Sequence, residues 1–260
     1  MEAFVHKSSV IADNVKLGEN VYIGPNCTLG FSGYQIKKNN KNVKPLKIGD
    51  KSIILSNTAI ANNVLIGKNV YIGPNCTLGF SGYQIKKNNK NVKPLKIGDK
   101  SIIHGNTIIC KGTQIGKECR LDYLSFIGEE TTIGKKCVIE YGAKIYDRVI
   151  IQDRCFISGF VSNDCLIEKN SIVQGDLIHK FKDIVPFKSE LSPIVKANSF
   201  IGRKALVIGP IVIEKGSYVG AGAIVTKSTK TKKLYLGVPA REVGFAPRIY
   251  IKNHKKIQKS

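Results

Sequence analysis

Residues 20–54 read NVYIGPNCTLGFSGYQIKKNNKNVKPLKIGDKSII, and the same 35 residues return unchanged at 69–103. The copies are offset by 49 residues, and a looser similarity extends the duplication to 8–54 and 57–103. A domain with one closed core has no place for a second copy of such a segment. A repeat protein takes it up by lengthening a stack. The duplication therefore favours a repeat architecture.

A period of six residues runs through most of the chain. An aliphatic residue recurs at every sixth position, the residue four places later is small or β-branched, and glycine often follows the aliphatic directly. This period is neither that of a helix nor that of a long strand. It predicts one short strand per hexad followed by a tight corner at the glycine, with three hexads closing a triangular coil and the aliphatic pointing inward. The aliphatic positions include Ile23, Leu29, Ile48, Ile54, Ile60, Ile66, Ile72 and Leu78, then Ile97 to Ile157, and Val195 to Val225.

These hexads resemble those of the hexapeptide-repeat acyltransferases, and the resemblance covers roughly residues 5–227. It implies an all-β fold, a left-handed parallel β-helix of about ten coils. The left hand comes from the resemblance, because parallel strands are usually joined by right-handed crossovers. We expect a β-helix domain over residues 1–229 and a basic C-terminal extension over residues 230–260.

Three segments interrupt the hexads and predict protruding loops at about residues 30–47, 79–96 and 176–193. From Ile23 to Ile72 there are six hexads, or 36 residues, and the remaining 13 of the 49 belong to the first loop. Six hexads make two full coils. The duplicated loops should therefore leave on the same side, about 10 Å apart. Loops on a rigid scaffold often carry function, so Phe80 and Tyr83 in the second loop are candidates for contact with an acceptor.

Two stretches near the end, YVGAGAIVTK at 218–227 and LGVPAR at 236–241, resemble the terminal coils of members that use acetyl-CoA. The resemblance implies acetyl-CoA as co-substrate. Bare glycine backbone would let a pantetheine arm lie along the coils, and cationic side chains would face its phosphates. Val238 stands where the family usually has asparagine. The implied coenzyme A residues are Gly220, Ala221, Gly222, Lys227, Pro239, Ala240 and Arg241.

Acyl transfer to a hydroxyl needs a base, and histidine suits neutral pH. His179 begins the third loop, where galactoside- and maltose-type O-acetyltransferases carry a catalytic histidine, commonly as His-Pro; here lysine follows. Asp176 is three residues away and could orient the ring. His104, at a corner directly after the second copy, is the second candidate. An N-acetyltransferase could work without either histidine, because a neutral amine is already nucleophilic.

The formal net charge of +22 raises the question of an anionic partner. No nucleic-acid recognition motif accompanies it, so we expect no nucleic acid. A lysine-rich C-terminus could touch an anionic membrane, although a solvated tail is the simpler interpretation.

Seven cysteines without an apolar leader at the start indicate a reducing, cytoplasmic setting. Cys119, Cys137 and Cys155 are one coil of 18 residues apart, at the small-residue position, which favours buried packing over a metal site. Four scattered histidines also lack the clustering of a zinc site, as in γ-class carbonic anhydrases. We expect no metal.

Taken with the resemblance, the sequence predicts an acetyl-CoA-dependent acetyltransferase acting on a sugar, in particular a nucleotide-linked amino sugar for surface-polysaccharide synthesis. The resemblance also implies a homotrimer with active sites between adjacent prisms. Two alternatives stay open: an acyltransferase of the lipid A type that uses an acyl carrier protein, and a non-catalytic trimeric scaffold. The acceptor, O- versus N-acylation, the acyl chain length and the natural or engineered origin of the duplication also stay open.

Overall fold

The computed structural model describes residues 1–31, 44–81, 93–180 and 192–247. Strands, turns and bends account for these ranges, and no helix within them is long and apolar enough to cross a membrane. The chain divides into two compact units, Met1–Thr131 (unit 1) and Thr132–Ser260 (unit 2). Each unit is described by itself.

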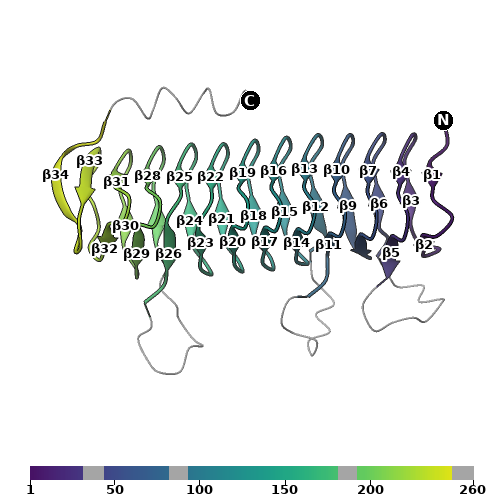
Figure 1. The fold of residues 1–260 in the computed structure, drawn as a ribbon, viewed down its shortest axis with the longest axis horizontal. Helices are drawn as coiled ribbons and strands as arrows, with labels where there is room; N and C mark the ends of the chain where they lie inside the picture. The colour runs from purple at the N-terminus through teal and green to yellow at the C-terminus, as the bar shows by residue number, and fades with distance from the viewer. Residues whose placement is uncertain (32–43, 82–92, 181–191, 248–260) are drawn as a thin grey trace. The chain divides into compact units, whose positions relative to one another are not determined.

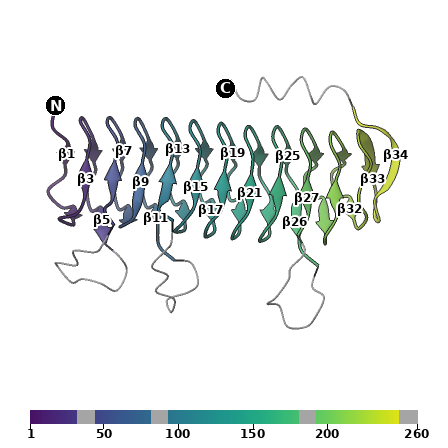
Figure 2. The ribbon, with the colours of Figure 1, turned by 180° about the vertical axis from the view of Figure 1, so that it is seen from behind.

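Unit 1 is a stack of coils that contribute short parallel strands to three sheets (Figures 1 and 2). Sheet A contains, in spatial order, β1 (Phe4–Val5), β4 (Tyr22–Ile23), β7 (Ile53–Ile54), β10 (Tyr71–Ile72), β13 (Ile102–Ile103) and β16 (Arg120–Leu121). Sheet B contains β2 (Val10–Ile11), β5 (Thr28–Phe31), β8 (Ala59–Ala61), β11 (Thr77–Leu78), β14 (Ile108–Ile109) and β17 (Phe126–Ile127). Sheet C contains β3 (Lys16–Leu17), β6 (Lys47–Ile48), β9 (Val64–Ile66), β12 (Leu95–Ile97) and β15 (Gln114–Ile115).

Unit 2 repeats this arrangement and ends with an antiparallel strand. Sheet D contains β19 (Val138–Ile139), β22 (Phe156–Ile157), β25 (Ile172–Val173), β28 (Phe200–Ile201), β31 (Tyr218–Val219), β33 (Lys233–Leu236) and β34 (Arg241–Phe245). Sheet E contains β20 (Lys144–Ile145), β23 (Phe160–Val161), β26 (Asp176–Ile178), β29 (Leu206–Ile208) and β32 (Ile224–Val225). Sheet F contains β18 (Thr132–Ile133), β21 (Ile150–Ile151), β24 (Leu166–Ile167), β27 (Ile194–Val195) and β30 (Val212–Ile213). β34 runs antiparallel to β33, whereas β33 is parallel to β31.

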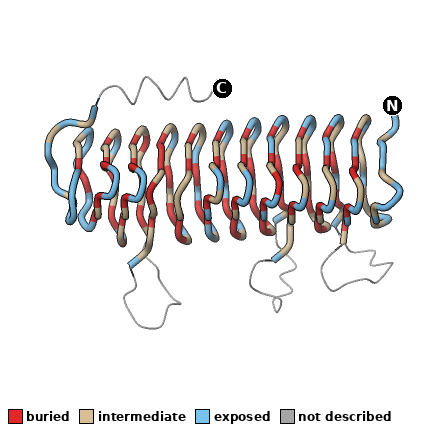
Figure 3. The backbone as a smooth tube through the Cα atoms, in the orientation of Figure 1, coloured by how far each residue is buried: buried red, intermediate tan, exposed pale blue. Residues whose placement is uncertain are grey.

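The predicted left-handed parallel β-helix is confirmed, and the aliphatic of each hexad forms its core. Ile23 pairs with Ile54 and Ile72 with Ile103 in register, and all four side chains are fully buried. Figure 3 shows the buried positions recurring along the coils of each unit. Burial of each such side chain is worth about 1.5–3 kcal/mol, and at the first coil, where no coil precedes it, Val5 is 37% exposed.

The small residue of each hexad links successive coils by hydrogen bonds. Thr58 Oγ1 donates to Gly73 O at 3.0 Å and accepts from Cys76 N at 3.2 Å. Ser52 makes the corresponding bonds to Gly67 O and from Val70 N. These buried hydroxyls are therefore satisfied by the backbone of the next coil, as buried polar groups require.

The corners differ from the prediction that the glycine after the aliphatic makes the turn. The left-handed residue is two places later, as at Asn57 and Asn106, each with φ 58°. Asparagine tolerates this region better than most residues, so its abundance has a structural cause. Glycine is needed for a different reason: a Cβ on Gly73 would come 2.5 Å from Gly105 N of the next coil.

The stretch between Ile157 and Ile167, which departs from the six-residue period, is also regular coil. The core there continues through Val161 and then Leu177, both fully buried, with only four residues from the preceding aliphatic. The shortening occurs at Gly159 and Gly175, and a Cβ on Gly159 would collide with Gly175 O. Two glycines in stacked corners thus allow two coils to lose two residues each.

The predicted positions of the duplicated loops are confirmed for their stems. The first loop leaves after β5 and returns at β6, and the second leaves after β11 and returns at β12. β8 lies between β5 and β11 in sheet B, and β9 lies between β6 and β12 in sheet C. The two stems therefore leave the same corner, two coils apart.

Candidate functional site

An acid–base cluster lies in unit 1 at the corner that follows β13. We call it the His104 corner, and it comprises Tyr71, His104, Arg120, Asp122 and Tyr123. His104 and Asp122 occupy the same corner position in successive coils, because they are 18 residues apart and their preceding aliphatics Ile103 and Leu121 pair in register. The parallel stack thus brings an imidazole and a carboxylate together.

Asp122 is the carboxylate that faces His104. Its Oδ1 lies 3.7 Å from His104 Nε2 and 3.2 Å from Arg120 Nε. The His104 and Asp122 side chains are 27% and 20% exposed, so both are shielded and still reachable. A 3.7 Å separation is an ion-pair contact and not a hydrogen bond, a looseness that catalytic pairs often show before substrate binds.

Two tyrosines hold the His104 ring in place. Tyr123 stacks on it with centroids 4.8 Å apart, and Tyr71 contacts it edge-on at 6.4 Å. Tyr123 is 49% exposed, so an aromatic face remains open to solvent beside the imidazole. Such stacked and edge-on contacts restrict the ring to few orientations.

A buried thiol fixes the backbone of this corner. Cys76 Sγ donates to His104 O at 3.2 Å, and His104 N donates to Leu121 O at 2.8 Å. Burial raises the pKa of the Cys76 thiol to about 11, so it acts as a neutral donor. All seven cysteines are buried and none forms a disulfide, as their hexad positions predict.

The sequence singled out His104 but missed Asp122, Arg120, Tyr71 and Tyr123. A signal existed for Asp122, since residues one coil apart occupy stacked corners. Arg120 stands two residues before Asp122 on the outer face of sheet A, which the same register also gives.

His179 lies in unit 2 directly after β26, half-buried. The predicted orienting residue, Asp176, is engaged elsewhere: its Oδ1 accepts a hydrogen bond from Phe160 N at 2.8 Å. This bond caps the shortened coil at Gly159. The histidine–carboxylate arrangement expected for His179 is thus seen at His104.

The residues expected to bind coenzyme A lie on the last coils of unit 2. Gly220 N donates to Tyr235 O, and a Cβ there would collide with the Leu236 side chain, so this glycine serves packing against β33. Gly222 has φ +70° and open space around its Cα. Ala221, Lys227, Pro239 and Arg241 are exposed, Ala240 is half-buried, and Ala240 N donates to Ile224 O at 2.8 Å. The only bare glycine backbone of the expected pair is therefore at Gly222.

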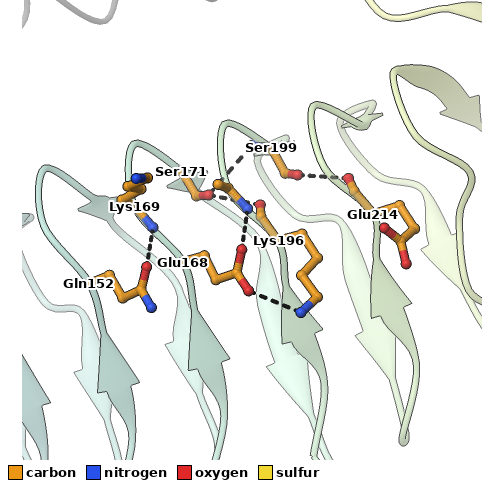
Figure 4. Close-up of polar contacts among 8 residues, drawn as sticks. Gln152, Glu168, Lys169, Ser171, Lys196, Ser199 and Glu214 are labelled. Carbon is orange, nitrogen blue, oxygen red and sulfur yellow. Dashed lines mark hydrogen bonds and ion pairs between the residues drawn. The ribbon is translucent and has the colours of Figure 1, made fainter.

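A second polar cluster in unit 2 is structural (Figure 4). Glu168 binds Lys196 Nζ and Ala197 N, each at 3.0 Å, and Gln152 accepts from Lys169 N. Burial opposes ionisation of Glu168, but these hydrogen bonds and the Lys196 charge outweigh it and lower the pKa of its carboxyl. Its groups bond to one another and to the backbone, so the cluster ties adjacent coils.

The second loop stem lies at a different corner of the prism from His104. Phe80 O accepts from Lys111 N, and Ser81 Oγ donates to Glu129 at 2.6 Å, all at the corner between sheets B and C. His104 lies at the corner between sheets A and B. Phe80 is half-buried, and Tyr83 lies outside the described residues.

No group of three or more histidine, cysteine, aspartate or glutamate side chains within the described ranges could hold a metal ion. The site chemistry seen here is thus that of an imidazole, a carboxylate and a guanidinium.

Three family models match parts of the chain. They are the GMPPB C-terminal domain over residues 45–142, the bacterial transferase hexapeptide (six repeats) over 2–30, and the hexapeptide repeat of succinyl-transferase over 194–227. The two hexapeptide models match segments whose hexads form coils in the structure.

Two curated relatives match short segments. A putative serine acetyltransferase of Schizosaccharomyces pombe is 36% identical over 58 residues, 22% of either chain. The bifunctional protein GlmU of Rubrobacter xylanophilus is 37% identical over 54 residues, 21% of this chain and 12% of that protein. The matches thus span about a fifth or less of the length of these relatives.

Solved structures match over nearly the whole chain. LpxA, a UDP-N-acetylglucosamine acyltransferase from Bacteroides fragilis, has a TM-score of 0.54 at 18% identity over 98% of this chain and 78% of that one. Another UDP-N-acetylglucosamine acyltransferase has a TM-score of 0.55 at 16% identity, over 98% and 80%. At such identities the likeness concerns the fold.

Proposed function

Because the chain belongs to the hexapeptide-repeat superfamily of left-handed β-helix proteins, we propose that it is an acyltransferase with His104 as its general base. The observation that carries the assignment of the base is Asp122 Oδ1, 3.7 Å from His104 Nε2 at a partly open corner. A histidine held by a carboxylate and within reach of substrate is suited to accept a proton at neutral pH.

The geometry defines how His104 would act. With Nε2–H directed at Asp122, the lone pair is on Nδ1, which accepts the proton from the attacking hydroxyl or amine. The new C–O or C–N bond forms as the C–S bond of an acyl thioester breaks. His104 then returns the proton to the leaving thiolate, and Asp122 keeps the ring oriented and stabilises the imidazolium in between.

Acetyl-CoA is the proposed acyl donor, and the exposed cations Lys227 and Arg241 are its proposed phosphate contacts. Support comes from the terminal motif and from Gly222, whose backbone is open. An acyl carrier protein as donor is the alternative, distinguished by weak binding of free acetyl-CoA.

The proposed acceptor is a nucleotide-linked amino sugar, the substrate class in the names of the two matching structures. We further propose that the chain works in the cytoplasm as a homotrimer. In unit 1 the second loop and His104 lie at different corners, so a site that uses both would draw the loop from a neighbouring copy.

The test is coenzyme A release by the full chain with a panel of sugars, amino sugars and their nucleotide-linked forms. His104→Ala should lower kcat/KM by about 10²–10⁴-fold, the usual contribution of a general base. His179→Ala is the matched variant and should retain activity.

Full activity in His104→Ala, or its loss only in His179→Ala, would overturn the assignment of the base. No turnover together with no binding of acetyl-CoA or an acyl carrier protein would leave the scaffold alternative.

A further inference from the structure

Arg120 is the member of the His104 corner that the proposed chemistry does not use. It projects from the outer face of β16 with its side chain 43% exposed. Its only contact among the described residues is Nε to Asp122 Oδ1 at 3.2 Å. Nε is shielded from solvent and yet lacks a hydrogen bond of acceptable angle, and no described group binds the terminal nitrogens. The guanidinium thus keeps its donors available.

The same carboxylate oxygen serves two cations. Asp122 Oδ1 is 3.2 Å from Arg120 Nε and 3.7 Å from His104 Nε2. A carboxylate held by a guanidinium is less available to a neighbouring imidazole. Release of Arg120 from Oδ1 would leave that oxygen to His104.

A guanidinium with open donors favours an oxyanion, because its planar fork matches two oxygens of a phosphate or carboxylate. The other members of the corner do not oppose an anion. Tyr71 and Tyr123 are neutral, and Asp122 carries the corner's single formal negative charge. The open face of Tyr123 would lie beside a group bound in this way.

We propose that Arg120 binds an oxyanion group of the acceptor, phosphate or carboxylate, and in doing so gives Asp122 Oδ1 to His104. An anionic acceptor then completes the histidine–aspartate pair that a neutral acceptor leaves loose. This inference rests on the proposed function and adds the acceptor's charge and the residue that selects it.

The first copy of the repeat supports the grouping of these three side chains. The positions 49 residues earlier hold Tyr71 for Arg120, Gly73 for Asp122 and Leu55 for His104. The copies therefore differ in the base, the carboxylate and the guanidinium together.

The kinetic test compares Arg120→Met, which keeps the stem without the charge, with Arg120→Lys, which keeps the charge without the fork. With a phosphorylated acceptor, Arg120→Met should raise KM and lower kcat, a loss of about 10- to 100-fold in kcat/KM. With the dephosphorylated acceptor it should change little, and Arg120→Lys should recover part of the loss. Arg148→Met is the matched control, because Arg148 is an exposed arginine paired with Asp164 in unit 2.

A second measurement does not depend on turnover. The His104 ring signals, assigned with His104→Gln, are followed by ¹⁵N NMR while inorganic phosphate or acetate is added. In the wild type the signals should move with the bound fraction, and in Arg120→Met they should stay. Phosphate alone would indicate a phosphoryl acceptor, acetate alone a carboxylate, and both a general oxyanion site.

Absence of any response in the wild type, or an equal response in Arg120→Met, would overturn the inference. If the signals respond but no acceptor is acylated, the anion site stands and the proposed function fails, so the two failures are distinguishable.

Discussion

The two copies of the repeat build the same corner and place different side chains on it. Cys27 Sγ donates to Leu55 O at 3.1 Å, and Cys76 Sγ donates to His104 O at 3.2 Å. The backbone support is thus the same in both. The first corner presents leucine where the second presents histidine, with Gly73 rather than Asp122 in the coil above. The repeat determines the architecture, and a few outward side chains determine the chemistry.

The largest effect is expected when the second corner is given the side chain of the first. His104→Leu should lower kcat/KM by about 10²–10⁴-fold, because the base is lost. The fold should persist, since leucine already stands at this corner in the first copy. Coenzyme A release measures the loss, and Leu55→His is the control. That variant should leave activity unchanged, and an active His104→Leu enzyme would break the comparison.

The core should respond equally in both copies. Ile54→Ala and Ile103→Ala each empty a fully buried position and should lower the free energy of unfolding by about 2–5 kcal/mol. Urea unfolding measures both. A variant with nearly wild-type stability would show that the two coils are not equivalent.

The glycine after the aliphatic should separate the copies. A Cβ on Gly73 would come 2.5 Å from Gly105 N, whereas on Gly24 it would come 3.1 Å from Ser56 N. Gly73→Ala should lower the free energy of unfolding by about 1–3 kcal/mol, and Gly24→Ala by less. Thermal unfolding of the two variants checks the order, and a larger loss in Gly24→Ala would contradict it.

The smallest effect is expected at the corner ion pairs. Asp99 bonds Lys117 at 2.6 Å, as Asp50 bonds Lys68 at 2.7 Å. The hydrogen bond from Lys117 first, and that from Lys68 N second, hold the pKa of the Asp99 carboxyl below its usual value. A lowered folded-state pKa stabilises above the unfolded-state value of about 3.9, and this contribution is lost as pH falls further.

Asp99→Asn should therefore lower the free energy of unfolding by less than about 1 kcal/mol at pH 7, because the pair is largely solvated. The difference from wild type should shrink below about pH 4. Asp50→Asn should follow the same direction. Urea midpoints across pH measure both, and a difference that grows on acidification would reject this account.

Most of the fold was predictable because one period governs it. An aliphatic such as Ile54 must face inward when three hexads close a coil, and the count of six hexads gave the side on which the loops leave. The prediction did not reach Val161 and Leu177, because two residues are missing at Gly159 and Gly175, where backbone contact between coils decides the length. It also assigned the corner to glycine, although the left-handed residue is two places later.

The site was predictable only in part. His104 was found by its chemistry, but the carboxylate beside it follows from stacking, which a linear spacing near His179 does not reproduce. Asp176 illustrates this limit: it is close to His179 in sequence, and its carboxylate bonds to Phe160 N. Contacts in a coil stack connect residues one turn apart more often than near neighbours.

A stack of parallel coils ends in an open edge onto which a further parallel strand could add. In unit 2 the strand beyond β33 reverses direction, and its pairing shifts between Leu234 and Tyr235. Lys233 lies 3.9 Å from the Phe245 ring, which brings a charge to this edge. Reversal, irregular pairing and an edge lysine all discourage strand addition. β34 would thus limit head-to-tail polymerisation and help keep a protein that grows by adding coils from growing into fibres.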